Sequence, residues 1–154
     1  MFKIKLTDAK RLLNYLLDQW GLDYLLGVEN DGITEAKFWD CSELSEKGFN
    51  IILSIPLPDG SGRQLKYCKE IGEEVYYPIS KVQPLDLVFL KKKDSEEIGH
   101  VAIVYGNMDP VGGMMLIEAR GGRFGKVMFT PLDKFLIEFH KRFAGIFRIV
   151  EING

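Results

Sequence analysis

The sequence has few residues that could do covalent chemistry: two cysteines, Cys41 and Cys68, and two histidines, His100 and His140. Cys41 follows Asp40, a good N-cap residue, so we expect it in the first turn of a helix. There the unpaired N–H groups and the positive end of the helix dipole favour a thiolate. A thiolate with an imidazole nearby to exchange its proton is a nucleophile. The alternative is a small buried cysteine on an amphipathic helix.

The two histidines stand in different settings. His100 follows Gly99 and opens the apolar run 101–105, so we expect its imidazole at the rim of a sheet. There it could face a helix packed on that sheet, although a lone histidine at a strand end is more often structural or solvated. His140 stands at the end of a predicted helix, where a cation complements the dipole, and we interpret it as structural.

Glu118 is the predicted partner of His100. If segments 100–104 and 114–118 pair antiparallel with Val104 opposite Met114, then His100 faces Glu118 at ~4.5–5.5 Å between Cβ atoms. The carboxylate would fix the tautomer of the imidazole, the third role in a nucleophile–base–orienter set. A slip of one residue would place the two side chains on opposite faces. The apolar side chains on the same face are expected to pack under the N-terminal helices; they are Ala102, Val104, Met114 and Leu116.

Other chemistries are disfavoured. The glycine-rich segment 121–125 lies between predicted strands and is better explained as a turn than as a phosphate loop. The cysteines and histidines lack paired metal-ligand spacing, so we expect no metal and no cofactor. With 20 basic and 22 acidic residues the net charge is −2, which argues against nucleic-acid binding. No apolar stretch approaches the ~20 residues of a membrane span.

Helices are predicted in the first half of the chain and strands in the second. Helical spacing of apolar residues covers 7–20, where Thr7 can cap the helix, then 40–49 and 63–71, and a short helix at 131–140 interrupts the strands. Short turns between the strands require antiparallel pairing. We expect an α+β fold with N-terminal helices packed on a central antiparallel sheet of about five strands. The predicted strands are 86–91, 100–105, 114–119, 126–129 and 145–152.

Length and the N-terminus complete the general expectations. A chain of 154 residues with 46% hydrophobic residues fits one domain, 1–154. The N-terminal residues lack the apolar core of a secretory signal, so we expect synthesis in the cytoplasm, with both thiols free.

Five segments, in order, resemble the NlpC-like cysteine peptidases, papain-like enzymes that cut the peptides of bacterial cell walls. The resemblance runs from about residue 24 to 149. Residues 40–44 (Asp-Cys-Ser-Glu-Leu) resemble the nucleophile motif Asp-Cys-Ser-Gly-Leu, and 83–89 resemble the strand Pro-Gly-Asp-Leu-Val-Phe. Residues 57–64 are similar to the linker before the next helix, 99–103 to the histidine motif, and 117–121 to the segment that holds the third polar residue.

The resemblance implies a role for each matching residue. Cys41 would be the nucleophile, His100 the general base and acid, and Glu118 the residue that orients the imidazole. Tyr24 stands where relatives carry a tyrosine that can direct its hydroxyl at the oxyanion or substrate. The residues that flank the nucleophile, Asp40 and Ser42, are assigned to the same oxyanion and substrate-binding region.

Three positions depart from the family pattern. Glu43 replaces the usual glycine of the nucleophile motif, and Leu85 replaces the glycine before Asp86. Glu118 replaces the commoner histidine, but a carboxylate can still orient an imidazole, so we do not interpret the change as inactivating. Glu43, next to the nucleophile, is expected to narrow the cleft or to repel an anionic substrate.

The function implied by the resemblance is hydrolysis of amide bonds in peptidoglycan stem peptides by a cysteine endopeptidase. The lack of an export signal suggests a phage-encoded enzyme, borne on a tail among tail proteins or released for lysis at the cell wall. The lack of an export signal is equally consistent with a domain excised from a larger secreted protein. A non-catalytic structural or wall-binding module is the main alternative, and an amidase or acyltransferase that uses the same residues is another.

Overall fold

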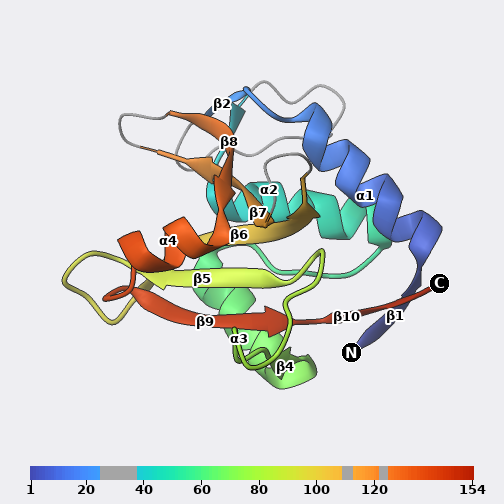
Figure 1. Ribbon diagram of the computed structural model, residues 1–154. Coiled ribbons are helices and arrows are strands. Elements are labelled where there is room, and N and C mark those ends of the chain that lie inside the picture. The colour runs from blue at the N-terminus through green and yellow to red at the C-terminus, as the bar shows by residue number, and fades with distance from the viewer. Residues whose placement is uncertain (25–37, 109–112, 122–124) are drawn as a thin grey trace.

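A computed structural model describes residues 1–24, 38–108, 113–121 and 125–154 (Figure 1). The helices are α1 (Leu6–Asp18), α2 (Cys41–Lys47), α3 (Ser61–Ile71) and α4 (Leu132–Glu138), and a π-helical turn, η1 (Gly48–Ile52), continues α2. The longer strands are β5 (Leu87–Lys91), β6 (Ile98–Asn107), β7 (Met114–Arg120), β8 (Lys126–Pro131) and β9 (Phe143–Arg148). The short strands are β1 (Phe2–Lys5), β2 (Asp23–Tyr24), β3 (Phe38–Trp39), β4 (Glu73–Glu74) and β10 (Val150–Asn153).

The expected α+β class and antiparallel sheet are confirmed. The order of the main sheet is β3-β2-β8-β7-β6-β5-β9-β4, and its central strands, from β8 to β9, are all antiparallel. These are the five strands that the sequence predicted. The sheet is wider because the two-residue strands β2, β3 and β4 pair along its edges.

The two faces of the sheet are covered by different parts of the chain. Side chains that alternate along the strands, such as Phe89, Val101 and Ile103, pack with α1, α2 and α3 in one core. Their neighbours point to the other face, where they pack against α4 and the segment 75–82 in a second core. The prediction that the apolar residues on the face of His100 pack under the N-terminal helices is therefore wrong. Ala102, Val104 and Leu116 lie in the second core, under α4, with Met114 at its margin.

The two ends of the described chain pair with each other. The predicted strand 145–152 divides, because β9 stays in the main sheet and β10 leaves it to pair parallel with β1 (Figure 1). The β1 pairing extends to Lys5, so α1 begins at Leu6 with Lys5 at the N-cap and no side-chain cap. The prediction that Thr7 caps this helix is wrong for that reason. None of the described helices has the length and apolar character needed to cross a membrane.

A buried ion pair joins the start of β5 to the end of β9. The carboxylate of Asp86 is fully buried and accepts two hydrogen bonds from Arg148, each 2.9 Å long. It also accepts from the backbone N–H of Gln83, and Arg148 donates in addition to the carbonyl of Lys81. The bidentate pair therefore fixes the segment before β5 onto the sheet.

Candidate active site

The first turn of α2 holds the predicted nucleophile. Asp40 is the N-cap residue in extended conformation, and its Oδ1 accepts a hydrogen bond of 2.7 Å from the backbone N–H of Glu43. Cys41 is then the first helical residue and is half-buried. The cap satisfies one of the unpaired N–H groups of the turn and leaves others free to face an anion. This is the setting that the sequence predicted for Cys41.

A buried glutamine on α3 holds this turn in place. The side-chain oxygen of Gln64 accepts a hydrogen bond of 2.7 Å from Ser45, which lies on α2. Its side-chain nitrogen donates to the backbone carbonyls of Ser42 and Pro58 at 2.8 and 3.0 Å. Gln64 is fully buried, and both of its side-chain polar atoms are hydrogen-bonded. The position of Cys41 thus depends on α3 as well as on α2.

His100 is hydrogen-bonded to Glu118 across β6 and β7, but not through the expected register. Val104 pairs with Leu116 rather than Met114, because Met114 lies opposite Asn107 and the ladder shifts by one residue between Val104 and Gly106. The observed register thus differs from the expected one by two residues, which keeps both side chains on one face as diagonal neighbours. His100 Nε2 and Glu118 Oε1 lie 2.7 Å apart.

The second oxygen of Glu118 has its own partner. Arg120 donates to Glu118 Oε2 at 2.8 Å, and its guanidinium lies over the rings of Phe135 and Phe139 at 5.8 and 5.1 Å from their centroids. The Glu118 side chain is completely buried, while that of His100 is 14% exposed. A buried carboxylate with both oxygens bonded cannot rotate freely, so it holds the imidazole in one orientation.

The electrostatics of His100 favour its protonated form. Burial alone would lower the pKa of His100, but hydrogen bonding and charge from Cys41 and from Glu118 raise it to about 9. Burial would likewise raise the pKa of Glu118, but His100 and Arg120 lower it below its ordinary value. Since Nε2 of the ring is taken by Glu118, Nδ1 is left for the thiol. The three side chains can therefore form a thiolate–imidazolium–carboxylate series.

A hollow of about 460 Å³ opens beside the thiol. Asp40, Cys41 and Ser42 line one wall, and the start of α3 with Ile98 and Gly99 lines the other. Ser42 donates a hydrogen bond of 3.3 Å to Asp40, and both residues line the hollow together with Cys41. Their assignment to oxyanion or substrate binding stays a prediction. The assignment of Tyr24 to oxyanion or substrate binding also stays a prediction, because its side chain lies outside the part that the structure describes.

Glu43 does not enter the hollow. It is 2% exposed and lies close enough to Tyr15 of α1 for its charge to add to the effect of burial, which raises the pKa of that tyrosine. The expectation that Glu43 narrows the cleft is therefore wrong, because this side chain turns into the core between α1 and α2.

Two site residues were missed from the sequence. Arg120 carried a signal, since it stands two residues after Glu118 on the same strand and must share its face. Gln64 carried a weaker signal, since it stands four residues before Cys68 on the apolar face of the predicted helix, although a polar residue on such a helix is usually exposed. His140 is exposed and its ring hydrogen-bonds the carbonyl of Ile137 at the end of α4, far in sequence from the thiol.

Comparison by sequence finds no matching protein-family model and no matching curated protein. Comparison by structure finds an NlpC/P60 family protein from Bacillus cereus, 23% identical, with a TM-score of 0.68 over 93% of this chain and 40% of that one. The NlpC/p60 domain of the peptidoglycan hydrolase SagA is 18% identical, with a TM-score of 0.58 over 82% of this chain and 92% of that domain.

An N-acetylmuramoyl-L-alanine amidase from Bacteroides uniformis is 14% identical, with a TM-score of 0.55 over 92% of this chain and 97% of that one. The chain spans less than half of the length of the first solved structures that it matches. At these identities the likeness concerns the fold. The chain therefore has the α+β, papain-like fold of the NlpC/P60 proteins.

Proposed function

We propose that this chain is a cysteine peptidase or amidase that hydrolyses amide bonds in the peptides of bacterial peptidoglycan. The observation that carries the proposal is the position of His100 between Cys41 and the buried carboxylate of Glu118. The fold shared with a peptidoglycan hydrolase and with a muramoyl-alanine amidase supports the choice of substrate class. We assign Cys41 as nucleophile, His100 as general acid and base, and Glu118 as the residue that orients the imidazole.

The reaction would proceed through an acyl-enzyme. The Cys41 sulfur forms a bond to the carbonyl carbon, and the carbonyl oxygen takes the electron pair as an oxyanion. Backbone N–H groups of the first turn of α2 stabilise that oxyanion. The imidazolium of His100 then gives its proton to the amine as the C–N bond breaks. A water, deprotonated by the neutral imidazole, attacks the thioester and returns the thiol.

The decisive test is mass spectrometry of muropeptides incubated with the wild-type protein and with Cys41→Ala. We expect new hydrolysis products with the wild type and none with Cys41→Ala. Cys68→Ala is the matched control, because Cys68 is buried away from the hollow and its loss should leave product formation intact. Equal product formation by Cys41→Ala and the wild type would refute the proposal. So would the absence of products with folded wild type across the common wall types.

A further inference from the structure

Arg120 is held against Glu118 from two directions. Its guanidinium donates at 2.8 Å to Oε2 of Glu118, while the other oxygen of that carboxylate contacts His100. It also lies over the rings of Phe135 and Phe139, 5.8 and 5.1 Å from their centroids. The side chain of Arg120 is 12% exposed, and that of Glu118 is completely buried. The charge of Arg120 therefore has a fixed place behind the carboxylate that orients the imidazole.

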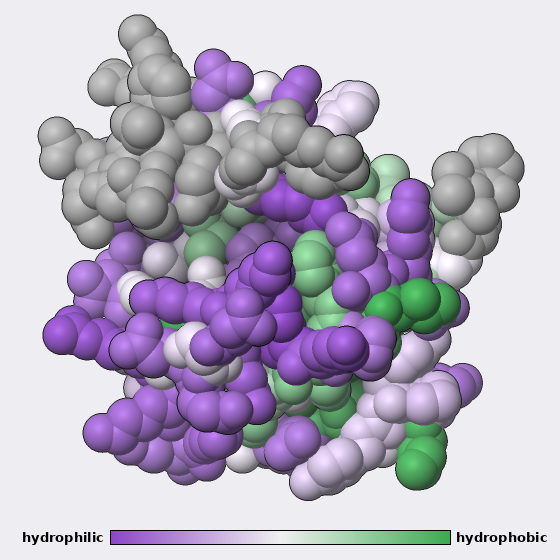
Figure 2. Space-filling model, turned by 90° about the vertical axis from the view of Figure 1, so that its left-hand side faces the viewer, coloured by the Kyte–Doolittle hydropathy of each residue, from purple (hydrophilic) through white to green (hydrophobic). Residues whose placement is uncertain are grey.

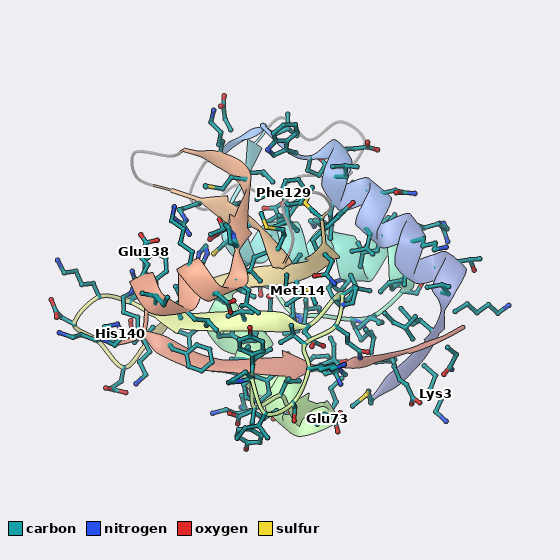
Figure 3. All side chains as sticks on the ribbon, in the orientation of Figure 1. Lys3, Glu73, Met114, Phe129, Glu138 and His140 are labelled. Atoms are coloured by element: carbon teal, nitrogen blue, oxygen red, sulfur yellow. The ribbon has the colours of Figure 1, made fainter. Side chains whose placement is uncertain are left out.

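A second carboxylate near Arg120 has less effect on it. Glu138, the last residue of α4, has Oε2 at 3.9 Å from Nη1 of Arg120, and its side chain is 45% exposed. Figure 3 shows Glu138 at that end of the helix. The surface there is mainly hydrophilic (Figure 2), so water and salt screen the charges on it. Arg120 therefore acts mainly on Glu118, which is closer and buried.

The charged groups around His100 come from α2, β7 and the segment before β9. The thiol of Cys41 and the carboxylate of Glu118 both raise the pKa of His100. Arg142, just before β9, lines a small hollow beside His100, but its Nε donates to a backbone carbonyl at the end of β5. The side chains that α4 and β5 bring to this region are uncharged, namely Phe135 and Leu90. Among the described residues, the cations that pair with Glu118 are His100 and Arg120.

This arrangement affects how strongly His100 holds a proton. Without the guanidinium, Glu118 would present its full negative charge to the imidazole, which would then release its proton less readily. The proposed reaction needs both forms of His100, because the imidazolium protonates the amine and the neutral ring then takes a proton from water. A fixed cation behind the carboxylate favours the return to the neutral ring. Glu118 stands where the family pattern has a histidine, and a neutral histidine would need no such counter-charge.

We propose that Arg120 is a positioning residue of the thiol site, whose guanidinium keeps Glu118 ionised and offsets part of the charge that this carboxylate presents to His100. It acts through Glu118 and does not touch the substrate. Its consequence for catalysis rests on the proposed function. Its effect on His100 can be measured in the protein without any substrate.

The test is an NMR titration of the His100 ring in the full chain. Removal of a positive charge strengthens proton binding at every group near it, so Arg120→Gln should raise the titration midpoint of His100 by about one pH unit. Arg120→Lys keeps the charge and should stay near the wild-type midpoint. Arg11→Gln is the matched control, because it removes the same charge from an exposed ion pair on α1, and it should leave the midpoint unchanged.

The sign of the change separates this role from a merely structural one. If Arg120 only held Glu118 in place, its loss would release the carboxylate from His100, and the midpoint would fall, as expected for Glu118→Gln. Arg120→Met is a second neutral variant that keeps the packing on Phe139, in case Arg120→Gln fails to fold. An unmoved or lower midpoint in a folded neutral variant would overturn the inference. So would a rise in Arg120→Lys as large as that in the neutral variants.

Hydrolysis of muropeptides gives an independent reading. In Arg120→Gln the alkaline limb of kcat/KM should move to higher pH together with the His100 midpoint. A raised midpoint without hydrolysis by the wild type would support the charge effect of Arg120 and refute the proposed function. Hydrolysis by the wild type with an unmoved midpoint and an unmoved limb in Arg120→Gln would overturn the inference and leave the proposed function intact.

Discussion

The two thiols of this chain differ in what surrounds them. Cys41 is half-buried at the wall of a hollow, next to His100. Cys68 is fully buried on α3, and burial raises its pKa to about 12. Since the thiolate is the reactive form, we predict that iodoacetamide modifies one thiol of the folded protein, at Cys41, as read by peptide mass spectrometry. Cys41→Ser should label at no site until urea exposes Cys68, and equal labelling of both thiols in the folded state would contradict the assignment.

The pKa of His100 predicts the alkaline limit of activity. The acid form of His100 is lost as pH rises through its pKa of about 9, so kcat/KM should fall above that pH. Glu118→Gln removes one of the charges that raise this pKa, so the alkaline limb should move to lower pH. The rate should also fall, by up to about 10⁴-fold if the amide holds the wrong tautomer. An unmoved limb in Glu118→Gln would show that the carboxylate does not act on the imidazole.

At the scale of the elements, α2 and α3 form one unit through Gln64. Gln64→Leu would remove one donor from the carbonyls of Ser42 and Pro58, and Ser42 would still accept from the Ser45 hydroxyl, so the cost is roughly 1–3 kcal/mol for the Pro58 carbonyl that loses this partner. We predict a loss of stability of about 1–3 kcal/mol in urea unfolding and slower alkylation of Cys41. Ser45→Ala is the milder control, since it removes one of those bonds and leaves both carbonyls paired. Equal effects of the two variants would contradict a clamp centred on Gln64.

The helices and strands could be predicted from the sequence, but the exact register in which the strands pair could not. Helical and alternating apolar patterns placed α2, α4 and the five long strands within a few residues. The predicted pairing of β6 with β7 failed because β6 continues to Asn107, which lies opposite Met114, and because a bulge next to Gly106, at φ +131°, then inserts one residue on β6. The His100–Glu118 contact survived because the net displacement, three residues at the hairpin less one at the bulge, is two and therefore even. An odd shift would have removed the predicted site.

Two departures from the family pattern show what tertiary packing adds. Leu85 has φ +76°, a left-handed conformation that glycine adopts without strain, which accounts for the glycine that relatives carry there. Its side chain is completely buried in the core under α1, α2 and α3. Glu43 turns inward toward Tyr15 on α1, and the sequence pattern around Glu43 does not predict a contact with another helix. Neither outcome could be read from the motif in which the residue stands.

At the scale of the whole molecule, the paired ionisation of His100 and Glu118 makes stability depend on pH. The pKa of His100 rises from 6.5 to about 9 on folding, so its contribution is full below pH 6.5 and is lost as pH rises toward 9. The pKa of Glu118 falls below 4.5, so its contribution is full above pH 4.5 and is lost as pH drops through the lower value. We predict maximal stability near pH 5–6, measured by urea unfolding. His100→Gln should flatten the alkaline slope, and an unchanged slope in folded His100→Gln would contradict the assignment.

The Asp86–Arg148 pair tests how the sheet and the segment before it hold together. Arg148 closes β9 onto β5 and also holds the carbonyl of Lys81, while Asp86 is fully buried. Arg148→Met should cost about 3–5 kcal/mol in urea unfolding, because it leaves a buried carboxylate without its partner. Asp86→Asn should cost less, since a neutral amide still accepts hydrogen bonds. In the double variant the losses should not add, because the first change already removes the shared interaction. Strict additivity would show that the two groups act independently, and the pair would then not be what fastens residues 81–86 to the sheet.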